Sequence, residues 1–193
     1  DQLAQHPGDR DAAAALADAA TEADYFLTRV HAVEALGAFP ANLARSAVTA
    51  AVHDTSSAVR AAAITTMGAL GGEGVAAIAR TAFHTDSSYD VRAAAFLTAI
   101  RADPANASAY ISRGFIWNDK KEHDIAIGDY SEAIRLDPGN EIAWNNRGIA
   151  WNDKKVYDKA IADFNESIRC DPKYAAAYTN RGLAWKQRKE YDK

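Results

Sequence analysis

The side chains best suited to catalysis or metal binding in this sequence are histidines and a single cysteine. They are His6, His31, His53, His84, His123 and Cys170. No two histidines have the spacing H-x-x-x-H, and no Cys/His combination has the spacing of a metal site. We therefore expect no metal, no cofactor and no catalytic residue, and we interpret the chain as a protein that is not an enzyme.

Each of these residue types also has a structural interpretation. His53 and His84 end two predicted helices, where the partial negative charge of a helix C-terminus favours a cation. A ligand or pH-sensing role is the alternative. Cys170 takes the place that Leu136 has one repeat earlier, so we interpret it as a packed side chain, with a nucleophile as the alternative. The glycine-rich stretch 71–74 lacks the Lys-Ser/Thr of a phosphate-binding loop and is predicted to be a flexible turn.

Composition and charge exclude several classes of protein. The chain has 193 residues, of which 48% are hydrophobic and 25% are charged, and this is typical of a globular protein. Its net charge of −4 includes no basic excess of the kind that nucleic-acid binding requires. No apolar run is long enough to cross a bilayer, and one cysteine cannot form an internal disulfide. We expect a cytoplasmic protein that binds neither nucleic acid nor membrane.

The two halves of the chain differ in composition. Residues 1–103 contain seven arginines, twelve acids and no lysine, whereas residues 104–193 contain nine lysines, six arginines, fourteen acids and all four tryptophans. This contrast predicts two domains, 1–103 and 104–193, joined by a natural or engineered fusion. The sequence begins without Met and stops in mid-pattern, so we expect a fragment.

The first half is predicted to form three helix pairs with a period of roughly 31 to 32 residues, within the range of helical-repeat proteins. The expected helices lie at about 9–21, 24–36, 41–53, 58–69, 73–84 and 88–102, and Asp9 and Asp24 are placed to cap the first two. A pair of short helices cannot bury both apolar faces alone, so the pairs must stack around one core. Small residues such as Ala63 and Ala95 allow the helix axes to approach closely.

The pattern Asp-x-Ser-x-x-Val-Arg-Ala-Ala-Ala occurs at 54–63 and again at 86–95. It resembles the HEAT repeat, and residues 1–103 also look like the C-terminal HEAT-like domain of bacterial zinc aminopeptidases. No HExxH is present, so the catalytic function does not carry over. The resemblance implies a ladder of Asp and Arg side chains along the stack. Its members would be Asp54 with Arg60, Asp86 with Arg92, and Arg29 near Glu22 or Asp24.

The second half has its own, slightly longer period. The recurring residues are Tyr110, Arg113, Gly114, Trp117, Ala126, Tyr130, Ala133 and Pro138, then Trp144, Arg147, Gly148, Trp151, Ala160, Phe164, Ser167 and Pro172, then Tyr178, Arg181, Gly182 and Trp185. A period of about 34 residues with these residue types resembles the tetratricopeptide repeat (TPR). Two full repeats are followed by a truncated third, whose first helix is expected at about 174–187. The glycines would let the paired helices approach, and the Asn-Asp-Lys-Lys strings at 118–121 and 152–155 are predicted to be solvated turns.

Residues 88–104 fit both repeat registers, because Val91 and Arg92 match the first array while Phe96, Ala99, Asp103 and Pro104 match the second. We predict an all-α, right-handed superhelix of about eleven helices, in which HEAT-like pairs continue into TPR pairs through one shared helix. Because this helix contains no internal Gly or Pro, we expect rigid coupling and no hinge at residue 103.

In TPR proteins the first helices line a groove that takes extended peptides or partner helices, and an ordinary solvated face is the alternative here. The matching residues share 3-4-3 helical spacing or lie beside such positions. They are Ile111, Phe115, Asn118, Asn145, Asn146, Ile149, Asn152, Thr179, Asn180, Leu183 and Lys186. The clamp that binds acidic chaperone tails uses Lys, Asn, Asn, Lys and Arg, but the corresponding positions here are Ile111, Phe115, Asn146, Ala176 and Asn180. We therefore expect no binding of such a tail.

The function that these features favour is a non-catalytic protein–protein interaction scaffold, built as a rigid fusion of two helical-repeat modules. The alternative is an accessory C-terminal fragment of a larger enzyme such as a zinc metallopeptidase. The partner is expected to be a protein or peptide. We also expect self-association, giving an oligomer, through the face that the truncated third repeat leaves open.

Overall fold

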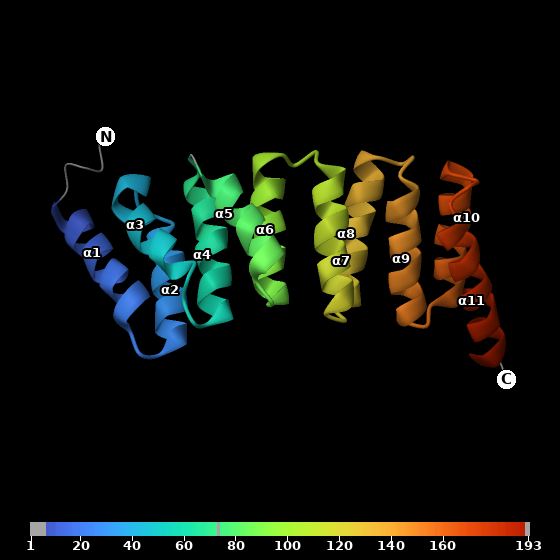
Figure 1. Ribbon diagram of the computed structural model, residues 1–193, viewed down its shortest axis with the longest axis horizontal. Coiled ribbons are helices and arrows are strands. Elements are labelled where there is room, and N and C mark those ends of the chain that lie inside the picture. Colours follow the sequence, from blue (N-terminus) through green and yellow to red (C-terminus); the bar gives the residue numbers. More distant parts are fainter. Residues whose placement is uncertain (1–6, 73, 192–193) are drawn as a thin grey trace. The chain divides into compact units, whose positions relative to one another are not determined.

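The computed structural model describes residues 7–72 and 74–191, and all secondary structure in these residues is α-helical (Figure 1). The contacts divide the chain into two compact units, residues 1–104 and 105–193. The first unit contains α1 (Pro7–Glu22), α2 (Phe26–Leu36), α3 (Ala41–Ala51), α4 (Ser57–Leu70), α5 (Val75–Thr85) and α6 (Tyr89–Ala102). The second contains α7 (Ala107–Asp119), α8 (His123–Leu136), α9 (Glu141–Asp153), α10 (Tyr157–Cys170) and α11 (Ala175–Tyr191). The prediction of an all-α solenoid is confirmed.

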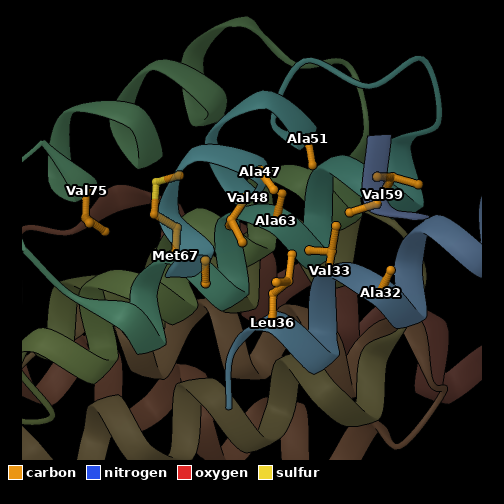
Figure 2. Packing of buried hydrophobic residues seen from close by; sticks show 12 residues of the cluster. Ala32, Val33, Leu36, Ala47, Val48, Ala51, Val59, Ala63, Met67 and Val75 are labelled. Carbon is orange, nitrogen blue, oxygen red and sulfur yellow. The ribbon is translucent and has the colours of Figure 1, made fainter. Parts of the chain in front are cut away.

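The core of the first unit is shared between successive helix pairs. Helix α2 packs on α4 and α4 packs on α6, while α1 packs on α3. Figure 2 shows Leu36 of α2, from the first pair, near Val48 of α3 and Met67 of α4, from the second pair, and all three are buried. Ala63 and Ala95 are buried as predicted. Stacking therefore buries the apolar faces that a single pair would leave exposed.

The starts of the first two helices differ from the sequence prediction. Helix α1 begins at Pro7, so Asp9 lies within its first turn. Helix α2 has Tyr25 at its N-cap position, with no side-chain capping bond. The backbone carbonyl of Asp24 instead accepts a hydrogen bond from Arg29 Nη1 at 3.1 Å. The prediction that the two aspartates cap these helices was wrong: Asp9 lies inside α1, and the turn between α1 and α2 is bound by Arg29, which donates to the backbone carbonyls of Ala23 and Asp24.

An Asp–Arg ladder runs along the first unit, and Arg29 and Arg60 each pair with the aspartate of the following repeat. Arg29 donates from Nε and Nη2 to Asp54 at 2.8 and 2.9 Å. Arg60 makes the same two bonds to Asp86 at 2.7 and 3.0 Å. The carboxylates of Asp54 and Asp86 therefore bind the arginine one repeat before the one inferred from the resemblance, although Arg60 Nη1 also donates to the backbone carbonyl of Asp54 at 2.9 Å. Arg92, which is next in the series, lies over the Phe83 ring at 5.4 Å.

Each ladder aspartate also holds its own interhelical turn. Asp54 accepts the backbone N–H of Ser56 at 2.7 Å, and Asp86 accepts that of Ser88 at 2.9 Å. The hydrogen bond from the Arg29 guanidinium, followed by that backbone bond and nearby positive charge, holds the pKa of Asp54 below its usual value despite partial burial. Arg60 lowers the pKa of Asp86 in the same way. Each of these aspartates therefore holds its own turn in shape and, at the same time, binds the arginine of the preceding repeat.

In the second unit, glycines allow the two helices of a repeat to pack closely. A Cβ added at Gly114 would lie 2.7 Å from Cε1 of Tyr130, and one at Gly148 would lie 2.6 Å from Cε1 of Phe164. Both aromatic side chains are almost fully buried. The predicted role of these glycines is confirmed, since any larger residue would force the helices apart.

A second set of ion pairs joins α7 to α8 and α9 to α10. Arg113 donates to both carboxylate oxygens of Asp129 at 2.9 and 2.6 Å, and Arg147 donates to both oxygens of Asp163 at 2.8 Å. These aspartates were not singled out from the sequence. The available signal was that each aspartate follows its arginine at the same separation in both repeats.

The turns after α7 and α9 are tight reversals centred on lysine. Lys121 and Lys155 adopt left-handed conformations with φ of 71° and 63°. In each turn the following residue, Glu122 or Val156, donates its N–H to a carbonyl five residues earlier, at 2.8 and 2.9 Å. This bond is characteristic of a Schellman motif. The predicted turns are therefore present, although Asn118 and Asn152 belong to the preceding helices.

Helix α11 is longer than predicted. The position equivalent to the reversals at Lys121 and Lys155 is Lys189, yet α11 continues to Tyr191. The Asn-Asp that ends α7 and α9 is replaced in α11 by Lys186-Gln187, which have higher helix propensity.

Candidate functional site

The predicted groove residues lie on α7, α9 and α11, the first helices of the three repeats in the second unit. Large apolar side chains on these helices are exposed: Phe115 is 59% exposed, Ile142 40% and Leu183 48%. Ile111 and Ile149 are half-buried, whereas Thr179 and Lys186 are exposed. Residues three or four apart on a helix share a face, so each helix contributes one stripe of this surface.

Three asparagines form a hydrogen-bonded chain between α9 and α11. Asn180 Nδ2 donates to Asn145 Oδ1 at 2.9 Å, and Asn145 Nδ2 donates to Asn146 Oδ1 at 3.3 Å. Asn145 is only 3% exposed, while Asn146 and Asn180 are half-buried. Asn145 thus links two repeats at the centre of this chain, and the amides of Asn146 and Asn180 form the two ends of the chain.

The asparagines near the ends of α7 and α9 have different surroundings. Asn118 Oδ1 lies 2.8 Å from His123 Nδ1, and Asn118 Nδ2 lies 3.5 Å from Asp153 Oδ2. Asn152 Oδ1 is buried and, among the described residues, has no hydrogen-bond partner. The place of His123 is taken by Tyr157 in the next repeat. This difference between repeats leaves an acceptor unsatisfied beside the groove residues of α9.

The arginines Arg113 and Arg147 of α7 and α9 are engaged in contacts within the protein. Arg113, whose pKa is raised chiefly by its hydrogen bonds to Asp129, is held between α7 and α8. Its guanidinium also lies over the Tyr110 ring at 5.7 Å, as that of Arg147 lies over Trp144 at 4.8 Å. Because these arginines hold the helices of their repeats together, the groups left to contact a ligand in the candidate groove are mostly amide and apolar side chains.

Among the described residues, the histidines and the cysteine do not belong to any group of three or more His, Cys, Asp or Glu side chains that could hold a metal ion. His6 lies outside those residues. His84 is exposed in the last turn of α5, where its ring is 4.8 Å from that of Phe83 beside a cavity of about 640 Å³. Burial raises the pKa of the Cys170 thiol, which disfavours the nucleophilic thiolate. Across residues 7–72 and 74–191, no helix could span a bilayer.

Solved structures with a similar fold are TPR domains. The Arabidopsis OM64 TPR domain is 21% identical, with a TM-score of 0.53 over 58% of this chain and 95% of that chain. The Sgt2 TPR domain from Aspergillus fumigatus is 19% identical, with a TM-score of 0.55 over 60% of this chain and 78% of that one. The first TPR of Spaghetti (RPAP3), bound to the HSP90 peptide SRMEEVD, is 18% identical, with a TM-score of 0.53 over 58% and 91%. At these identities the likeness shows the fold alone.

No curated protein matches the chain. The HEAT repeat family matches residues 13–100, and the tetratricopeptide repeat family matches residues 88–141 and 119–175. The two matches overlap at residues 88–100, which include most of α6 and lie in the stretch that fits both repeat registers. The chain therefore consists of a HEAT-like segment followed by tetratricopeptide repeats.

Proposed function

We propose that the chain is a non-catalytic protein–protein interaction scaffold whose TPR unit binds an extended peptide or a partner helix. The observation that carries this proposal is the surface of α7, α9 and α11, where exposed Phe115, Ile142 and Leu183 lie among amide side chains. Exposed aromatic and aliphatic side chains beside hydrogen-bonding groups are typical of binding surfaces. The amides supply groups that match a peptide backbone.

Asn146 and Asn180 are the amides best placed for this role. Asn146 accepts from Asn145 through Oδ1, which directs its Nδ2 towards other acceptors. Asn180 donates through Nδ2, and its Oδ1 can accept an N–H group. One donor and one acceptor at the ends of a fixed chain of amides would bind a backbone carbonyl and a backbone N–H of the peptide. Asn145 contributes by positioning these two side chains.

Two TPR structures with this fold support a peptide as partner. The Spaghetti (RPAP3) domain is bound to an HSP90 peptide, and the second TPR domain of human RPAP3 is in complex with the HSP70 peptide SGPTIEEVD. The positions that would clamp an acidic tail are here Ile111, Phe115, Asn146, Ala176 and Asn180, none of which is cationic. We therefore propose a peptide with apolar side chains for Phe115 and Leu183, and no dependence on a terminal carboxylate.

We further propose that residues 88–100 carry the sequence register of both repeat arrays and that the two modules, at 1–103 and 104–193, have separate origins. Support comes from the overlap of the two family matches at residues 88–100 and from the absence of lysine before residue 104. A chain of this kind would present two repeat surfaces from one polypeptide. No residue of the HEAT-like segment is assigned to the groove.

The groove is tested by selecting binders from a displayed random peptide library on the whole chain. We expect peptides with two apolar side chains, and we expect the double substitution Phe115→Ser and Leu183→Ser to weaken their binding at least tenfold. Both residues are exposed, so the variant should retain its fold. A chaperone-tail peptide ending in EEVD should bind poorly to either protein.

The matched control is Ile125→Ser. Ile125 is 48% exposed, similar to Leu183, but lies on α8 rather than on the three groove helices. Selected peptides should bind this variant as they bind the parent chain. Equal loss of binding in both variants would indicate a general effect of surface apolarity, and unchanged binding in the groove variant would exclude the groove.

A further inference from the structure

A cavity of the first unit lies between α4, α5 and α6. Its volume is about 640 Å³, within the range typical of small-molecule sites, and every described residue that lines it belongs to these three helices or to the turn before α5. Its apolar wall includes buried Val75 and Ala79 of α5 and the half-buried rings of Phe83 and Phe96. The two rings meet edge to face, with their centroids 4.7 Å apart. This cavity is separate from the groove residues of α7, α9 and α11.

The packing of α5 explains why there is space beside it. Within the described residues, α3 packs on α1, whereas α5 does not pack on α3 and rests mainly on α6. The turn before α5 is held instead by Arg45 of α3, whose Nη2 donates to the carbonyl of Gly71 at 2.6 Å. A Cβ added at Gly72 would lie 2.6 Å from the same nitrogen, so this side chain fills the contact between α3 and the turn. Helix α5 is therefore fixed at its start and along α6, and a cavity is left on each of its two sides.

The ionisable side chains that line the cavity between α4, α5 and α6 are all basic. They are Arg80 and His84 of α5 and Arg101 of α6, and all three are exposed. Acids outnumber arginines in residues 1–103, yet none of the described acidic residues lines this cavity. The cavity thus combines an apolar wall with a basic edge.

The two arginines at this edge keep hydrogen-bond donors that the fold does not use. Arg101 donates through Nη1 to the carbonyl of Thr65 at 2.8 Å, and its Nε and Nη2 have no partner among the described residues. Arg80 makes no hydrogen bond or ion pair with another described residue. Arg29 and Arg60 of the same unit, by contrast, each bind a carboxylate through two nitrogens. A guanidinium with free donors matches the geometry of a carboxylate.

We propose that this cavity binds a small apolar carboxylate, such as a fatty acid of the size of decanoate. The hydrocarbon chain lies against Val75, Phe83 and Phe96, where it displaces water from apolar surface. The carboxylate lies at the basic edge, within reach of the unused donors of Arg80 and Arg101. A cationic head group on the same chain would meet charge of its own sign at this edge, so the cavity selects anions.

Calorimetric titration of the whole chain with decanoate tests the proposal. We expect saturable binding of one decanoate per chain. Octanoate should bind about fifteenfold more weakly, which is the effect of two fewer buried methylene groups. Decylammonium has the same chain with the opposite charge and should bind at least tenfold more weakly than decanoate.

The basic edge is tested with the double substitution Arg80→Gln and Arg101→Gln. Both side chains are exposed, so the variant should fold. It should weaken decanoate binding at least tenfold without weakening the binding of decylammonium. The matched control is Arg10→Gln, an exposed arginine of α1 that does not line the cavity, and it should leave the affinity for decanoate unchanged.

The apolar wall is tested by filling the cavity from α5. Ala76 and Ala77 are neighbouring exposed residues of this helix, but Ala76 lines the proposed site and Ala77 lines the cavity on the α3 side. Ala76→Phe should weaken decanoate binding at least tenfold. Ala77→Phe introduces the same side chain next to it and should leave binding unchanged.

Four results would overturn the proposal. They are absence of saturable binding, equal affinity for decanoate and decylammonium, unchanged binding in Ala76→Phe, and loss of binding in the double variant Phe115→Ser and Leu183→Ser. The last result would place the fatty acid in the TPR groove. Because decanoate should bind this groove variant as it binds the parent chain, the proposed site stands or fails independently of the peptide-binding function.

Discussion

Gly148 and Phe164 are in such close contact that a methyl group on the glycine would lie 2.6 Å from the ring atom Cε1. Phe164 is 1% exposed, so its ring has no room to move away. We expect Gly148→Ala to lower the free energy of unfolding by about 1–2 kcal/mol, because overpacking outweighs the gain in helix propensity. Urea unfolding followed by circular dichroism measures this change.

Gly128→Ala is the control for that substitution. Gly128 lies in α8, where an added Cβ would meet no described atom within 4 Å. Alanine should therefore raise the free energy of unfolding by up to about 1 kcal/mol through helix propensity alone. Changes of the same sign in both variants would refute the view that Gly148 is required for close helix packing.

The Asp–Arg ladder should make the HEAT-like unit sensitive to acid. The folded-state pKa values of Asp54 and Asp86 lie below their usual value, so the unfolded chain binds more protons at low pH. The ladder's contribution is complete above the unfolded pKa of about 3.9 and is lost as pH falls through the lower folded values. Denaturation midpoints between pH 6 and pH 2 should fall less steeply for the double variant Asp54→Asn and Asp86→Asn. Parallel curves for variant and parent would contradict this prediction.

Tyr130 should make the TPR unit sensitive to alkali. Burial, followed by the charge of Asp129, raises the pKa of the Tyr130 hydroxyl. The folded state therefore holds this proton more tightly, and its contribution to stability is complete below about pH 10 and lost as pH rises further. Tyr130→Phe, which reproduces Phe164 of the next repeat, should flatten the alkaline limb of the stability profile. The control Tyr25→Phe alters an exposed side chain and should leave that limb unchanged.

Replacing the lysines that have a left-handed backbone conformation, Lys121 and Lys155, with glycine should stabilise the protein. Lys155 has a φ of 63°, a conformation that costs a residue with a Cβ about 1 kcal/mol and that glycine adopts freely. Lys155→Gly should raise the midpoint of thermal unfolding, and Lys121→Gly should act in the same direction. Lys155→Ala removes the charge but keeps the Cβ, so it separates the two effects. A stabilisation by alanine as large as that by glycine would assign the gain to charge.

Asn145 and Phe115 are expected to differ in how much they contribute to the free energy of unfolding. Asn145 is buried and bonded to both Asn146 and Asn180, so Asn145→Ala should lower the free energy of unfolding by about 1–3 kcal/mol. Phe115→Ala, at a side chain that is 59% exposed, should change it by less than about 0.5 kcal/mol. Thermal unfolding of both variants checks this. Equal destabilisation would show that Phe115 is part of the core rather than of a binding surface.

Sequence periodicity was sufficient to predict the repeat architecture. The regular recurrence of equivalent residues in each half predicts helix pairs that must stack, and the family matches at 13–100 and 88–175 agree with this. The glycine positions were also informative. Gly114 and Gly148 are each followed, at the same interval, by the aromatic residue that the glycine contacts.

Pairings between repeats were not predictable in the same way. Asp54 was placed with Arg60 because the resemblance to the HEAT repeat implies that pair, yet the Asp54 carboxylate accepts two bonds from Arg29 of the repeat before it. Likewise, Asn145 was assigned to a binding surface because it shares the spacing of exposed positions. Only packing of α11 against α9 shows that its amide is buried and bonded to Asn180.

The sequence by itself determined which segments are helical, how they pair and where the two repeat types meet, because these depend on local propensity and on periodic burial. Only the tertiary structure decided which arginine each aspartate binds, which asparagines remain accessible, and that a Cβ at Gly182, unlike one at Gly114 or Gly148, would meet no described atom within 4 Å. The physical reason is that a repeat pattern places the same residue types on the equivalent helix face of every repeat. Whether a given face is covered depends on the element that packs against it, and that element lies in a different repeat.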